Sequence, residues 1–98
     1  MNKVIVTRHA GMVEWLSLHG VEGDVIAHAT PEDVRGRDVY GILPLNLAAE
    51  AFTITTVDMP GLKPEQRGQD LSPAEMDEAG ATMTTYRVDV VMEEEAAE

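Results

Sequence analysis

The spacing of apolar residues along the chain switches several times between a strand-like and a helix-like pattern. Short apolar runs rich in β-branched residues predict strands at 3–7, 24–27, 37–43, 53–59 and 82–91. Helical spacing predicts helices over 12–18 and 44–52, and a third from Ser72 to Gly80. At the start of the third helix, Ser72 and Glu75 have capping-box spacing and Pro73 occupies the first helical position.

Strands separated by helices, without internal repeats, predict one α/β domain with a mainly parallel sheet and helices on both faces. We expect a small Rossmann-like domain over residues 1–92, and a solvated, disordered acidic tail over 93–98. The last strand is expected at an edge of the sheet, because one of its faces is more polar. Trp15 is interpreted as a core residue, and Met12, Met76 and Met83 as core or interface filling.

Composition limits the classes of function. No apolar run reaches the roughly 20 residues that a membrane-spanning helix needs, so no membrane association is expected. The chain starts without the features of a secretory signal and has no cysteine, which excludes disulfides and thiolate chemistry and suggests a cytoplasmic protein. A net charge of -11 argues against binding to duplex DNA. A small anion held by a local basic cluster remains compatible with that charge.

In parallel sheets, ligands bind beyond the carboxyl ends of the strands, so the residues at those ends are the candidate site. They are Thr7, Arg8 and His9 after the first predicted strand, His28 after the second, Pro44 and Asn46 after the third, and Arg67, Gly68 and Gln69 in the long loop 60–71 after the fourth. This loop has two prolines, two glycines and no periodicity, which is typical of functional loops. No P-loop, GxGxxG motif, zinc-binding histidine pair or serine elbow is present, and no cofactor or metal is predicted.

Arg8 stands where a strand ends and a helix begins, and this position suits a phosphate. The backbone N–H groups of Ala10 and Gly11 at the helix start would add to the grip of the guanidinium. His9 is a candidate general acid or base, because imidazole changes protonation near neutral pH. Structural alternatives stay open: Arg8 could pair with a surface carboxylate, Arg67 could be an ordinary loop arginine, and Asn46 could cap its own helix.

Four stretches in this order carry a resemblance to a known family: "VTRHAGMVEWLSLHG", "GDVIAH", "GILPLNLAAE" and "RGQDLSPAEMDEAGA". Over about residues 3–91 the chain resembles the small CRISPR-associated Csx proteins of the VVA1548 type, which accompany type III CRISPR systems. The resemblance implies a CARF-related fold, a homodimer, and ring nuclease activity on cyclic oligoadenylate, most of all cyclic tetra-adenylate.

The matched motifs imply roles for the site residues. Arg8 would grip a phosphate, Arg67 would stabilise charge on the reacting phosphorus, and His9 would protonate the leaving oxygen. The remaining positions, Thr7, Ala10, Gly11, His28, Pro44, Asn46, Gly68 and Gln69, would contact the ligand. Two other functions stay open, a sensor or sponge that binds the ring without cutting it and a small protein-interaction module.

Overall fold

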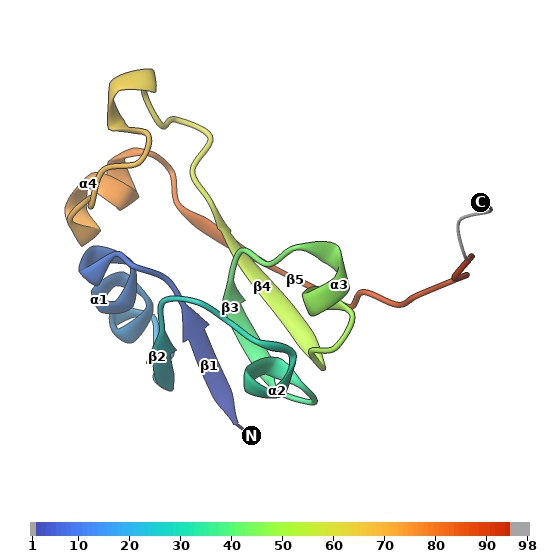
Figure 1. Ribbon diagram of the computed structural model, residues 1–98. Helices are drawn as coiled ribbons and strands as arrows, with labels where there is room; N and C mark the ends of the chain where they lie inside the picture. Colours follow the sequence, from blue (N-terminus) through green and yellow to red (C-terminus); the bar gives the residue numbers. More distant parts are fainter. Residues whose placement is uncertain (1, 95–98) are drawn as a thin grey trace.

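The computed structural model describes residues 2–94, which form a single sheet with short helices around it (Figure 1). Its strands are β1 (Lys3–Val6), β2 (Asp24–Ile26), β3 (Asp38–Gly41), β4 (Thr53–Asp58) and β5 (Thr82–Tyr86). The helices are α1 (Ala10–Leu18), α2 (Pro31–Val34), α3 (Leu45–Ala48) and α4 (Pro73–Glu78), and a 3₁₀ turn, η1, spans Pro64–Gln66. Within residues 2–94, no helix combines the length and the apolar character needed to cross a membrane.

The strands follow the order β2-β1-β3-β4-β5 across the sheet. β1 pairs in parallel with both β2 and β3, and β3 pairs in parallel with β4. Each connection between parallel strands contains a helix, as a crossover from one end of the sheet to the other requires. Only β5 runs antiparallel within this sheet, along β4. The α/β fold with a mainly parallel sheet is therefore confirmed.

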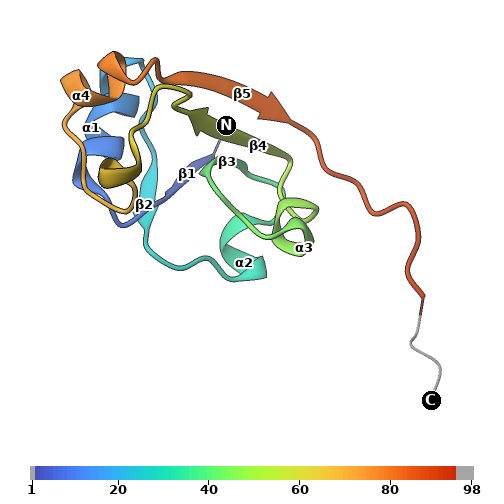
Figure 2. The ribbon, with the colours of Figure 1, turned by 90° about the horizontal axis from the view of Figure 1, so that it is seen from above.

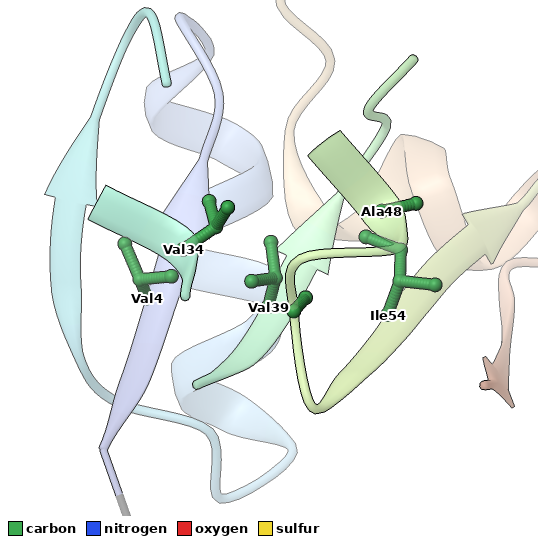
Figure 3. Close-up of a cluster of buried hydrophobic side chains, with 6 residues drawn as sticks. Val4, Val34, Val39, Ala48 and Ile54 are labelled. Carbon is green, nitrogen blue, oxygen red and sulfur yellow. The ribbon is translucent and has the colours of Figure 1, made fainter. Parts of the chain in front are cut away.

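Each face of the sheet has its own apolar core, since successive residues of a strand point to opposite faces. Val4 and Ile5, neighbours in β1, are both fully buried, one in each core. Under α1 and α4 the core consists of Ile5, Trp15, Leu16, Val21, Leu71 and Met76. Under α2 and α3 it consists of Val4, Val34, Val39, Ala48, Ala51 and Ile54 (Figure 3). Figure 2 shows the two pairs of helices on opposite sides of the sheet.

Trp15 joins α1 to α4. Its side chain is 2% exposed, and its indole Nε1–H donates a hydrogen bond of 2.8 Å to Asp77 Oδ1. The ring of His19 stacks on the indole with 3.9 Å between the ring centroids. The interpretation of Trp15 as a core residue is confirmed, and the bond to Asp77 satisfies the one polar atom of a buried indole.

The edge strand β5 is shorter than expected. The predicted strand 82–91 ends at Tyr86, because its partner Ile54 lies next to the first residue of β4 and the ladder ends there. All five residues of β5 are exposed and none is charged. Directly after β5, Val88 packs against the core under α2 and α3, and the chain beyond it runs away from the sheet (Figure 2). Met83 is thus exposed instead of filling a core. Of the expected tail 93–98, positions 93 and 94 are exposed, and 95–98 lie outside the described residues.

The helix expected over 44–52 is a single turn, α3, with Pro44 as its N-cap. Tertiary pairing overrides the helical pattern after Ala49: Glu50 accepts a backbone hydrogen bond from Gly36, and Ala51 forms a β-bridge with Arg35. Within α3, Ala48 is buried, whereas Leu45 is 75% exposed. Because α3 is short, the chain reaches β4 a few residues after the helix ends.

Helix α2 was not predicted, although its signal is local. Thr30 is the N-cap, Pro31 occupies the first helical position, and Asp33 completes a capping box. The Asp33 carboxylate accepts hydrogen bonds of 2.9 Å from both the backbone N–H and the hydroxyl of Thr30. Four residues are too few to show apolar periodicity, so only the cap could have indicated this helix.

The same contacts make the stability contributed by this cap dependent on pH. The hydrogen bonds from the Thr30 backbone and hydroxyl hold the pKa of Asp33 below its usual range, and the charge of Arg37 acts in the same direction. A carboxyl group whose pKa is lower in the folded than in the unfolded state stabilises the fold at pH values above the unfolded-state pKa. That stabilisation is lost as the pH falls from about 4 through the folded-state pKa. We expect Asp33→Asn to lower the urea midpoint at pH 7 and to have a smaller effect at pH 3. Glu32→Gln is the matched control, and equal effects of Asp33→Asn at the two pH values would contradict the prediction.

Candidate functional site

A pocket of about 520 Å³ opens at the carboxyl ends of the parallel strands, in the size range of small-molecule sites. The loop between β4 and α4 covers it from one side. The residues around the pocket come from the ends of β1, β2, β3 and β4, from α1 and α4, and from this loop. They are Val6, Thr7, Arg8, His9, Met12, Ala27, Gly41, Ile42, Val57, Met59, Leu62, Gln66, Gly68, Gln69, Leu71 and Met76.

The turn 7–9 is held by its backbone. The Thr7 N–H donates to Ile26 O at 3.0 Å, which ties the turn to the end of β2. The His9 N–H donates to Thr7 Oγ1 at 3.1 Å, and His9 O accepts from the Met12 N–H as α1 begins. His9 is therefore the N-cap of α1 through its backbone, with no capping bond from its ring.

These contacts leave the side chains of Arg8 and His9 free. Within residues 2–94 neither side chain forms an ion pair or a hydrogen bond to protein. Arg8 is exposed and His9 is half-buried, and both line the pocket. A guanidinium without a protein partner can bind an anion, and an imidazole beside it can exchange a proton with that anion.

The loop 59–71 is ordered by contacts at its two ends. The Gly61 N–H donates to Ala79 O at 2.8 Å, and Leu71 is buried in the core under α1 and α4. Between them, the Lys63 N–H donates to the side-chain oxygen of Gln66 at 3.0 Å. Gly68 follows with φ +79°, a value that favours glycine. The loop thus presents its middle residues at the mouth of the pocket.

Asp70 fastens this loop to the start of α1. Its Oδ1 accepts a hydrogen bond of 3.0 Å from the N–H of Gly11. The first turn of α1 contains no acidic residue, so this carboxylate supplies the negative charge that a helix N-terminus favours. Gly11 is buried against Leu71, and its N–H is not directed at the pocket as the phosphate-grip prediction assumed. The two partners are 59 positions apart in the sequence, so no local pattern signals this contact.

The cationic side chains are divided between the two ends of the sheet. Arg35 and Arg37 form ion pairs at the amino ends of the strands. Arg8, Lys63 and Arg67 belong to the segments at the carboxyl ends and form no ion pair within the described part of the chain. Lys3 and Arg87, at the amino ends of the parallel strands, likewise form no ion pair within residues 2–94. The pocket end differs in that none of its three cations is paired with a carboxylate, in a chain whose net charge is -11.

The structure brings together part of the predicted site. Thr7, Arg8, His9, Gly68 and Gln69 all line the pocket. Ala10 lines a second, more open hollow that shares the turn 7–9 with the first.

Four other predicted residues, His28, Pro44, Asn46 and Arg67, are exposed and are not among the residues that line the pocket. Arg67 is close to it in sequence, between Gln66 and Gly68, which do line it. The roles given to all these residues stay predictions.

The sequence reasoning missed most of the apolar wall. Met12 and Met76, interpreted as core filling, pack in the core under α1 and α4 and also line the pocket. Ile42 and Met59 line it as well, directly after β3 and β4. The rule that identified Arg8 and His9 applies equally to apolar residues after a strand, so position was the available signal.

Within residues 2–94 no group of three or more His, Asp or Glu side chains is placed to bind a metal ion. The groups available for chemistry are the guanidinium of Arg8, the imidazole of His9 and the hydroxyl of Thr7. They can bind a phosphate, stabilise additional negative charge on it, and supply a proton.

Comparison with known proteins gives one match. A family model described as "Putative CRISPR-associated protein (Cas_VVA1548)" matches residues 4–89, a span that contains every residue lining the pocket. No curated protein and no solved structure matches the chain. The matched span covers most of the 98 residues and agrees with the resemblance carried by the four stretches of sequence. The chain therefore belongs to the CRISPR-associated protein family Cas_VVA1548.

Proposed function

We propose that this protein is a ring nuclease that binds and linearises cyclic oligoadenylate, with cyclic tetra-adenylate as the preferred ring. The observation that carries the proposal is the pocket at the carboxyl ends of the strands, where Arg8 and His9 have no protein partner. Membership of a CRISPR-associated family supports a ligand from CRISPR signalling. The proposed place of action is the cytoplasm.

The proposed reaction needs no metal. A ribose 2′-oxygen attacks the adjacent phosphorus, the bond from phosphorus to the 5′-oxygen breaks, and a 2′,3′-cyclic phosphate and a 5′-hydroxyl result. The 2′-hydroxyl gives its proton to solvent, and His9 supplies one to the departing 5′-oxygen. Arg8 binds the phosphate and stabilises its charge as the fifth bond to phosphorus forms. Holding the 2′-oxygen in line with the bond that breaks supplies much of the acceleration.

Arg67 enters this proposal from the loop. Its side chain is exposed and does not line the pocket, but its neighbours Gln66 and Gly68 do, and Gly68 has φ +79°. In the proposed complex it turns over the ring and adds a second positive charge at the reacting phosphate. Two copies of the chain, related by a twofold axis, face the ring together and offer it two equivalent pockets.

One incubation tests the function. The purified chain is mixed with cyclic tri-, tetra- and hexa-adenylate in excess EDTA, and the products are separated by chromatography and identified by mass. We expect linear products ending in a 2′,3′-cyclic phosphate from cyclic tetra-adenylate. The same sample in size-exclusion chromatography with light scattering should have the mass of a dimer.

Two results would replace the proposal. Tight binding of the ring without any linear product would identify a sensor or sponge. Absence of binding to all three rings would remove the ligand class altogether and favour a protein-interaction module. Cleavage that stops in EDTA would refute the metal-independent mechanism.

A further inference from the structure

The pocket is lined by two kinds of side chain. Thr7, Arg8 and His9 are polar and suit a phosphate. Met12, Ile42, Val57, Met59, Leu62 and Met76 form the apolar part of the lining. A phosphate placed against these apolar side chains would lose its hydration without gaining donors, at a large cost in free energy. The apolar part of the lining therefore needs an uncharged, flat or apolar part of the ligand.

Gln66 also lines the pocket, and its side-chain amide is oriented by the backbone of Lys63. Its side-chain oxygen accepts the Lys63 N–H at 3.0 Å, which fixes the oxygen and the NH₂ group of the amide. The NH₂ group has no protein partner within residues 2–94, and the oxygen keeps a second lone pair. One donor beside one acceptor matches the N7 and N6–H₂ edge of adenine. Guanine presents an acceptor where adenine has its amino group, so it fits this amide less well.

Ile42 adds an independent indication at the mouth of the pocket. It lies directly after β3, lines the pocket, and is 82% exposed. A large apolar side chain in that position gains from being covered by a ligand. Methionine side chains on the other walls adapt readily to a flat aromatic ring and make favourable sulfur contacts with it.

We propose that the apolar, methionine-rich part of the pocket lining binds an adenine base of the ligand, selected by the Gln66 amide and covered by Ile42. The inference rests on the proposed function for the identity of the ligand and adds where and how its base is recognised. Arg8 and His9 then meet the phosphate next to that base, in the same pocket.

The test uses free adenosine, which contains the base and no phosphodiester. The full chain is labelled with ¹³C in its methionine methyl groups, and adenosine, guanosine and inorganic phosphate are titrated separately by NMR. Ring currents of a bound base should shift the signals of Met12, Met59 and Met76. Met83 and Met92 lie outside the pocket lining and serve as internal controls. Each signal is assigned from its Met→Leu variant.

Two variants test which residues recognise the adenine base. Ile42→Ala should weaken adenosine binding about tenfold through lost apolar contact. Leu45→Ala is the matched control, since Leu45 is 75% exposed nearby and does not line the pocket. Gln66→Glu keeps an acceptor for the Lys63 N–H and removes the NH₂ donor, so it should lower adenosine affinity about tenfold. Adenosine should still be preferred over guanosine, because a carboxylate can accept from the N6–H₂ group of adenine and finds no donor on the N7 and O6 edge of guanine. Circular dichroism verifies that each variant is folded.

Three results would overturn the inference. They are shifts of the pocket methionines with phosphate but not with adenosine, equal shifts of all assigned methionines, and equal loss in Ile42→Ala and Leu45→Ala. Failure of the proposed function is distinct from all of them. A chain that binds adenosine in this manner and leaves cyclic tetra-adenylate intact would keep the base site and lose only the nuclease.

Discussion

Cleavage of cyclic tetra-adenylate is expected to slow about 100-fold or more when His9 is replaced with alanine, the usual effect of removing a general acid. His9 lines the pocket, and its ring has no hydrogen-bond or ion-pair partner within residues 2–94, so the substitution removes a proton donor without breaking a hydrogen bond or ion pair of that ring. The measurement is the single-turnover rate with enzyme in excess. The loss should appear in this rate, with little change in the affinity for the ring.

Arg8→Ala should lower both the affinity for the ring and the cleavage rate. The reason is that the variant lacks a side chain that binds the phosphate in the ground state and in the transition state. Two control variants at the other side of the molecule should cleave at the parent rate. Arg35→Ala removes a cation paired with Glu50, and His19→Gln removes an imidazole that stacks on Trp15 and does not line the pocket. If His9→Ala and Arg67→Ala both cleave at the parent rate, the assignment of these residues is wrong.

A large loss of stability is expected from Gly11→Ala. A Cβ at position 11 would lie 1.7 Å from the carbonyl oxygen of Leu71, which is backbone of the loop and cannot rotate away. The loop must detach or α1 must shift, at a cost of about 3 kcal/mol or more. The usual gain of about 1 kcal/mol for alanine over glycine within a helix is too small to offset it. Urea unfolding followed by circular dichroism measures the difference.

Gly68→Ala is the control for a methyl group added in the same region. A Cβ there meets nothing within 4 Å, and the only cost is the left-handed backbone at φ +79°, about 1 kcal/mol. A Gly11→Ala variant as stable as its parent would show that the loop does not pack on α1 as described. A Gly11→Ala variant that folds should have lost the pocket, since Asp70 and Leu71 hold the loop over it.

Elements with strong local signals could be predicted from the sequence. The runs at 3–7 and 53–59 combine β-branched residues with clear ends, and both are strands within one residue of the prediction at each end. The capping pair of Ser72 and Glu75 placed the start of α4 correctly. The wrong element boundaries were those set by pairing between segments that are distant in the sequence. Contacts of Gly36 and Arg35 with residues 50 and 51 ended α3 early, and the end of β4 ended β5.

The candidate site follows the same division. Residues immediately after a strand lie at the pocket, as Thr7, Arg8 and His9 do. The first residue after each parallel strand lines the pocket, as Ala27 and Ile42 do, whereas His28 and Pro44, two and three residues after their strands, do not. His9 lines it three residues after β1 because the turn 7–9 leads directly into α1 beside the pocket. The contact between Gly11 and Asp70 depends on the packed fold and has no signature in either segment.

The uncharged edge strand β5 has a consequence for handling the protein. Natural sheets usually protect an open edge with charged side chains or proline, and the sequence TMTTY has neither. At neutral pH, mutual repulsion between chains of net charge -11 therefore keeps their open edges apart. At the isoelectric point near pH 4.5 this repulsion vanishes while the edge stays open, so acidic buffers invite strand-to-strand aggregation that neutral buffers suppress.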